Sequence, residues 1–183
     1  WDAANVKTET VNVQTVKKPD TAVQMYKQGE LDFANISQTS AIYNANKNNE
    51  DVIDIAEARA DYLVYNETGS VEALTNEKIR EALNLATDRE GLVKAAADTG
   101  TNPATLATLT DGTDLNEFVS QPYTFDKEKA AQLFKEGLAE LGVDSLTLTI
   151  TADSDNPIKK AATDYIKELW ETTLPGLTVE EKF

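Results

Sequence analysis

The chain has 183 residues, of which 40% are hydrophobic and 27% charged, with a formal net charge of −15. These values allow a hydrophobic core in one large domain or two small ones, and they argue against binding nucleic acid, whose phosphates need a basic face. The absence of cysteine and histidine excludes disulfides, thiolate metal sites and histidine-based catalytic triads within the chain, and no apolar run approaches the roughly 20 residues that span a bilayer.

Four elements are predicted in the first 50 residues. Apolar and polar residues alternate over 11–15, which predicts a strand. Pro19 predicts the start of a helix, and Gly29 suits the position just past its end. A short extended piece over 31–36 and a polar helix over 37–46 follow.

The middle of the chain is predicted to contain two extended segments, a helix and a loop. The apolar residues in 52–55 and 60–65 predict that both stretches are extended. Thr75 is the predicted N-cap of a helix with a continuous apolar face formed by Ile79, Ala82, Leu83 and Ala86. The stretch 100–122 is rich in Thr, Asp, Asn and Gly, which predicts a long surface loop.

The last 60 residues predict a helix followed by a strand, a second helix and a second strand. Asp126 is the expected cap of the first helix, and Gly142 its end. Leu146–Ile150 alternate as a strand, Pro157 opens the second helix, and Leu177 begins the last strand. A strand, helix and strand in this order predict a crossover unit with parallel strands.

Paired carboxylates are candidates for catalytic or metal-binding chemistry. Asp153 and Asp155 are near neighbours and could form a glycosidase pair or a metal cluster. Capping of the next helix by Asp155 or Asn156 is the better interpretation, because a helix start needs acceptors for its free N–H groups. Residues 111–114 resemble a calcium loop but lack the full pattern of spaced oxygens.

Two further groups have both a structural and a ligand-binding interpretation. Arg89, between Asp88 and Glu90, could bind a carboxylate ligand, but such a group more often pins a helix end to a neighbour. Tyr62 and Tyr65 could contact a ligand through their flat rings and polar tips, or pack in a core.

Four stretches carry a family resemblance along the whole chain. They are Trp1-Asp2, the segment 20–33 that ends in Gly-Glu-Leu-Asp-Phe, the stretch 65–93 with Ile-Arg-Glu-Ala-Leu-Asn-Leu-Ala-Thr-Asp-Arg, and the helix 129–142. In these stretches the chain resembles the family 5 extracellular solute-binding proteins, the oligopeptide, dipeptide and nickel receptors of bacterial ABC importers. In that family the Arg-x-Ala…Asp-Arg residues look structural.

The resemblance implies a two-lobed fold. We expect an α/β to α+β class, with mixed sheets and flanking helices, like the type II periplasmic binding proteins. Residues 1–60 would be a late part of the first lobe and residues 61–183 much of the second, with a boundary near 57–61. Because the chain begins at Trp1 with no signal peptide, we expect it to be part of a longer protein.

The resemblance also implies a function without catalysis. The expected role is to capture oligopeptides between the lobes by backbone hydrogen bonds and to deliver them to the membrane permease of an ABC importer. The expected protein is monomeric, uses no cofactor or metal, and lies on the extracellular face, attached through a lipidated cysteine outside this chain. The expected ligand contacts are Tyr62, Tyr65, Asn66, Asp153 and Asn156.

Three alternatives remain open from the sequence. The same fold could bind a nickel chelate, a haem or a sugar. The chain could be a hydrolase that uses Asp153 with a distant Glu. It could also be a non-catalytic interaction domain whose contact surface is the loop 100–122. We further expect the isolated chain not to bind peptide detectably, because half of the cleft would be absent.

Overall fold

The structure, a computed structural model, describes residues 4–36, 40–53, 61–68, 71–96, 118, 123–153 and 156–183. It forms two compact units, unit 1 over Trp1–Lys47 and unit 2 over Asn48–Phe183. The lobe boundary predicted near 57–61 falls almost wholly outside the described residues. The assignment of residues 1–60 and 61–183 to two lobes therefore stays a prediction.

Unit 1 contains two short helices, α1 (Pro19–Lys27) and α2 (Ser40–Asn46). Pro19 occupies the first turn of α1, as predicted, where a missing N–H removes no helical hydrogen bond. Gly29 follows the helix with φ of 76°, a left-handed conformation that favours glycine. The helix positions predicted in this unit are thus confirmed within the described residues.

The strand predicted over 11–15 is wrong. This stretch has no regular secondary structure, and Val11 and Val13 are 76% and 88% exposed. Alternating apolar residues stabilise a strand only when a neighbouring strand satisfies the backbone and one face is covered. The described part of unit 1 supplies no such neighbour.

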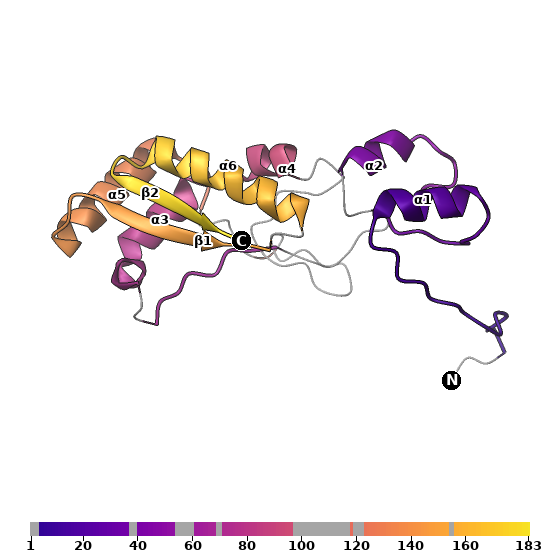
Figure 1. Ribbon diagram of the computed structural model, residues 1–183. Helices are drawn as coiled ribbons and strands as arrows, with labels where there is room; N and C mark the ends of the chain where they lie inside the picture. Colours follow the sequence, from indigo (N-terminus) through magenta and orange to yellow (C-terminus); the bar gives the residue numbers. More distant parts are fainter. Residues whose placement is uncertain are drawn as a thin grey trace. The chain divides into compact units, whose positions relative to one another are not determined.

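Unit 2 contains one 3₁₀ turn, four α-helices and two strands among its described residues, drawn in Figure 1. In chain order they are η1 (Glu72–Thr75), α3 (Glu77–Leu85), α4 (Arg89–Ala96), α5 (Lys127–Leu141), β1 (Leu146–Thr151), α6 (Pro157–Thr173) and β2 (Leu177–Lys182). The strands β1 and β2 are parallel neighbours, with Leu146 opposite Leu177 and Thr151 opposite Lys182. The predicted crossover unit is confirmed, and α6 lies along the strand pair (Figure 1).

The helix ends follow local capping chemistry. The N-cap of α3 is Asn76, whose side chain accepts a hydrogen bond from the Ile79 N–H, so the predicted cap Thr75 is wrong by one residue. Asp126 caps α5 by accepting from the Lys129 N–H, as predicted. Gly142 ends the same helix with φ of 69°, also as predicted.

The core of unit 2 joins α3, α5, α6 and one face of the sheet. Its largest fully buried side chains are Phe134, Ile79, Leu83, Leu174 and Val179. On β1 and β2 buried and exposed residues alternate, so the other face of the sheet presents mainly threonines and charged residues. No helix among the described residues is long and apolar enough to cross a membrane.

Side chains of α6 cap the outer edge of β2. The Val179 N–H points away from β1 and donates to Oε1 of Glu171 at 2.7 Å. The carbonyl of the same residue accepts from Nζ of Lys167. Both backbone groups at this point of the edge are therefore satisfied without a third strand.

Helices α3 and α5 approach closely at Gly137. A Cβ atom on this glycine would lie 2.7 Å from Cδ1 and 2.9 Å from Cγ1 of Ile79, which is fully buried. Ordinary contacts between carbon atoms are about 3.5–4.0 Å, so an alanine there forces the two helices apart or shifts Ile79.

We predict that Gly137→Ala lowers the free energy of unfolding by about 1–3 kcal/mol, because the added methyl overpacks the helix crossing. Ile79→Val, which removes Cδ1, costs about 0.5–1.5 kcal/mol alone. The double variant is expected to lose less than the two single losses added together, since valine makes room for the alanine methyl. Urea unfolding of the four proteins measures this coupling, and strict additivity would contradict the proposed contact.

Candidate functional site

The turn Thr87–Arg89 links three helices of unit 2. Oγ1 of Thr87 donates to the carbonyl of Leu83 in α3 at 2.7 Å and accepts from Nε1 of Trp170 in α6 at 3.0 Å. Oδ1 of Asp88 accepts the N–H of Gly91 at 3.0 Å, at the start of α4. These contacts make the turn a structural junction.

Arg89 is occupied by backbone acceptors. Its Nη1 donates to the carbonyl of Thr87 at 3.3 Å and to that of Tyr123 at 3.5 Å. These bonds favour the interpretation that Arg89 pins a helix end to its neighbour over the one in which it binds a ligand carboxylate.

The segment Tyr62–Asn66 combines an exposed part with an anchored part. Tyr62 and Val64 are 81% and 78% exposed, whereas Tyr65 is half-buried and packs against the core. Asn66 forms a local turn, because its Oδ1 accepts from the N–H and Oγ1 of Thr68 at 3.2 and 2.7 Å. The segment belongs to neither strand of the described sheet.

The phenol of Tyr65 lies in a low-polarity environment near two arginines. Burial raises the pKa of this phenol from 10.0 to about 12, against the opposing effect of the Arg89 guanidinium. The neighbouring Tyr123 raises the pKa of Tyr65 further, whereas Arg80, like Arg89, lowers it. Arg80 also reaches Oε1 of Glu67 at 3.5 Å and the carbonyl of Leu74 at 2.8 Å, which holds the segment against η1.

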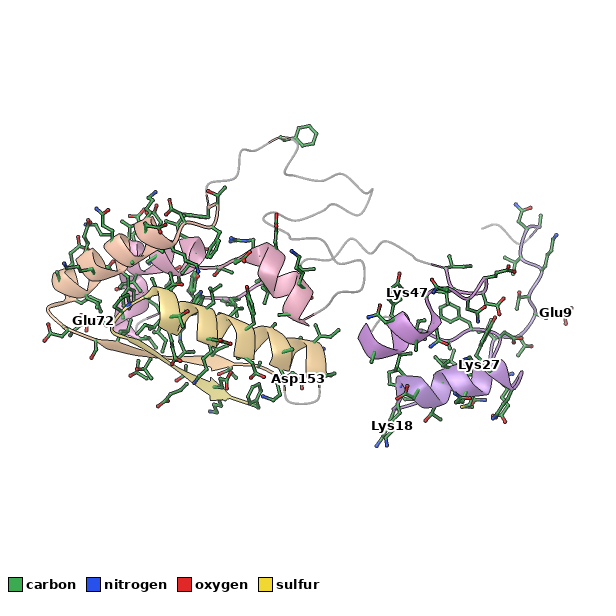
Figure 2. All side chains as sticks on the ribbon, turned by 90° about the horizontal axis from the view of Figure 1, so that it is seen from above. Glu9, Lys18, Lys27, Lys47, Glu72 and Asp153 are labelled. Atoms are coloured by element: carbon green, nitrogen blue, oxygen red, sulfur yellow. The ribbon has the colours of Figure 1, made fainter. Side chains whose placement is uncertain are left out.

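Asp153 and Asn156 lie between the end of β1 and the start of α6. Oδ1 of Asn156 accepts the N–H groups of Ile158 and Lys159 at 3.0 and 3.1 Å, which caps α6. The Asn156 N–H points to the carbonyl of Asp153 at 3.4 Å. The side chain of Asp153 is exposed, and Figure 2 shows it beside the start of α6.

The capping interpretation is therefore confirmed for Asn156. Asp155 lies outside the described residues, as do the loop 100–117 and the calcium-like stretch 111–114, so the acid-pair and calcium-loop interpretations remain predictions. Among the residues that the structure describes, no three acidic side chains gather in a way that could hold a metal ion.

Sequence reasoning missed four side chains of α6, β2 and the residue after β2. Nζ of Lys160 lies 4.5 Å above the ring of Phe183 and 3.0 Å from Oδ1 of Asp164. Glu181, on β2, has a buried Oε1 atom that accepts no hydrogen bond from the residues that the structure describes. The alternation of Leu177, Val179 and Glu181 was the signal, because it places a glutamate on the covered face.

Unit 1 has a hollow of about 480 Å³ between α1 and α2. Its lining includes Lys18 and Lys27, which Figure 2 labels, and the apolar residues Val23 and Ile42. None of the five predicted ligand contacts lies in it.

Comparison with known proteins places the whole chain in one family. Residues 1–183 match the family described as bacterial extracellular solute-binding proteins, family 5 middle. A dipeptide-binding protein of Lactococcus lactis is 37% identical over 194 aligned positions, which cover all of this chain and 35% of that protein.

Solved structures of solute-binding proteins have a fold similar to that of this chain. Listeria monocytogenes OppA bound to peptide superposes with a TM-score of 0.77 and 25% identity, over all of this chain and 37% of that one. Campylobacter jejuni NikZ in complex with Ni(L-His) superposes with a TM-score of 0.61 and 25% identity, over 91% of this chain and 35% of that one. The predicted type II binding-protein fold is thereby confirmed, and the chain spans about a third of the length of these relatives.

We predict that Tyr65→Phe reduces the loss of stability at alkaline pH. Because the folded-state pKa of Tyr65 is raised from 10.0 to about 12, its contribution is complete below pH 10 and is lost as pH rises toward 12. The urea midpoint of the parent protein should therefore fall more between pH 9 and pH 11 than that of the variant. Equal falls would show that this phenol is not buried in the folded protein.

We also predict that Asn156→Ala costs about 1 kcal/mol of stability, while Asn156→Ser costs little, since serine supplies another capping oxygen. Unfolding free energies of the two variants measure the difference. A similar loss in both would indicate that the amide does more than cap α6.

Proposed function

The chain belongs to family 5 of the bacterial extracellular solute-binding proteins, and we propose that the complete protein is the peptide receptor of an ABC importer. The observation that carries this proposal is the match along the entire chain, at 37% identity, to a dipeptide-binding protein. The peptide-bound relative of similar fold supports the same ligand class.

The proposed mechanism is passive binding in a cleft between two lobes. An extended peptide is held by backbone hydrogen bonds, each of which contributes about 1 kcal/mol net. Contacts of this kind are largely independent of side-chain identity, so hydrated side-chain pockets can accept varied sequences. The protein forms and breaks no covalent bond in this scheme.

Two places in unit 2 are the proposed contacts with the ligand. The first is the segment Tyr62–Asn66, whose exposed part can pair with an extended peptide. The second is the turn Asp153–Asn156. Tyr65 and Asn156 are each held by contacts to the fold, so binding would cost little additional ordering of these two residues.

The partners and location follow from the same proposal. The receptor would be a monomer that delivers its peptide to the importer's permease. It would work on the extracellular face of the membrane, attached by a lipidated cysteine outside this chain. A nickel chelate, haem or sugar as ligand, a hydrolase and an interaction domain remain alternatives that no specific observation favours over peptide binding.

We predict that the full-length protein is stabilised by peptide pools in a thermal-shift screen, because a ligand that binds only the folded state raises its stability. Tyr65→Ala and Asp153→Ala should each weaken peptide binding about fivefold or more, as expected for the loss of about 1 kcal/mol. Calorimetry with one peptide from the responding pool measures the affinities.

Asp144→Ala is the matched control for Asp153→Ala. Asp144 is also exposed, but it precedes β1 and so lies at the opposite end of that strand. Unchanged affinity in both test variants would remove these residues from the proposed contacts. A full-length protein that responds to no peptide pool would refute the proposed function itself.

A further inference from the structure

The segment Tyr62–Asn66 has no strand partner among the residues that the structure describes. It belongs to neither β1 nor β2, and its residues Tyr62 and Val64 are exposed. Tyr65 is the residue through which it packs against the core of unit 2. Because no sheet ladder fixes this segment, its conformation depends on the side chains that contact its ends.

Arg80 of α3 contacts the chain directly after this segment. Its Nε lies 3.5 Å from Oε1 of Glu67, and its Nη1 donates to the carbonyl of Leu74 in η1 at 2.8 Å. Burial raises the pKa of the Tyr65 phenol, whereas the charges of Arg89 and Arg80 lower it, so both guanidiniums lie near this ring. The Arg80 guanidinium thus connects α3 with η1, with the end of the segment and with the neighbourhood of its buried residue.

The helix that carries Arg80 is firmly packed on its other side. Ile79, the preceding residue, is fully buried in the core. Lys78 contacts Glu136 at 2.7 Å and Glu140 at 2.9 Å, both on α5. Helix α3 is therefore held by α5, while Arg80 extends from it toward the segment.

The chemistry of arginine suits such a contact. A guanidinium presents five N–H donors in one rigid plane, so it can hold a carbonyl and a carboxylate at a fixed separation. The side chain of Glu67 is 54% exposed, and ion pairs with an exposed partner contribute little to the stability of a fold. We therefore expect this contact to fix the local conformation of the chain, with little effect on the stability of unit 2.

We propose that Arg80 is a positioning residue, which holds the segment Tyr62–Asn66 in its peptide-binding conformation through Glu67 and the Leu74 carbonyl and does not itself touch the peptide. A segment that is already held in this conformation loses less conformational freedom when a peptide binds, which raises the affinity. This inference rests on the proposed function as a peptide receptor.

The first test measures amide hydrogen exchange in the full-length protein without ligand. Arg80→Lys keeps the positive charge but removes the planar fork, and we predict at least about threefold faster exchange over residues 62–68. Lys78→Gln is the matched control, because it removes ion pairs of the same helix on the side that faces α5. Unchanged exchange over 62–68 in Arg80→Lys, or an equal increase in Lys78→Gln, would overturn the assignment.

The second test measures affinity by calorimetry, with di-, tri- and tetra-alanine as probes of the backbone contacts. We predict that Arg80→Lys weakens binding at least about threefold, that Glu67→Gln also weakens it, and that Lys78→Gln leaves it unchanged. The double variant Arg80→Lys, Glu67→Gln should lose less than the two single losses combined, because both substitutions remove the same contact. Thermal midpoints show that every variant is folded at the temperature of the measurement.

The two tests separate the positioning role from the proposed function. An affinity that is unchanged in Arg80→Lys, reduced equally in Lys78→Gln, or reduced by strictly additive amounts in the double variant would overturn the positioning role. If the parent protein binds none of the alanine peptides, the proposed function itself is contradicted. The exchange measurement needs no ligand, so it still decides whether Arg80 holds the segment.

Discussion

The hydrogen bond from Trp170 to Thr87 is the contact on which the arrangement of unit 2 depends. Thr87 also bonds back to Leu83, so a single hydroxyl joins the end of α3 to the last turn of α6. The adjacent Asp88 starts α4 and accepts from the hydroxyl of Tyr165 in α6 at 3.5 Å. Because α6 connects β1 to β2, this turn also positions both strands and the polar groups at their carboxyl ends.

The same turn lies near the first of the two places proposed to contact a ligand. Arg89 holds the carbonyl of Tyr123, and its guanidinium lies near the phenol of Tyr65. The segment Tyr62–Asn66 is therefore supported by the same group of contacts that joins α3, α4 and α6. The proposed binding between two lobes needs such internal stiffness, because hinge closure transmits contacts only through parts that do not themselves deform.

Much of unit 2 could be predicted from the sequence because its signals are local. Asp126, Gly142 and Pro157 mark helix ends through their own backbone chemistry, and the alternation from Leu146 to Ile150 shows which face of β1 is covered. The strand over 11–15 could not be predicted correctly, because alternation reveals a tendency and not the presence of a partner. The unpaired oxygen of Glu181 could not be predicted for a related reason. Whether an inward glutamate finds a donor depends on side chains far away in the chain, such as Lys160.

The capped edge of β2 bears on self-association. Sheets that expose two complementary edges can add copies head to tail without limit, which produces fibres. Lys167 and Glu171 already occupy the backbone groups of Val179, so an incoming strand would first have to displace both side chains. The two side chains thus obstruct the addition of another strand at this point of the edge.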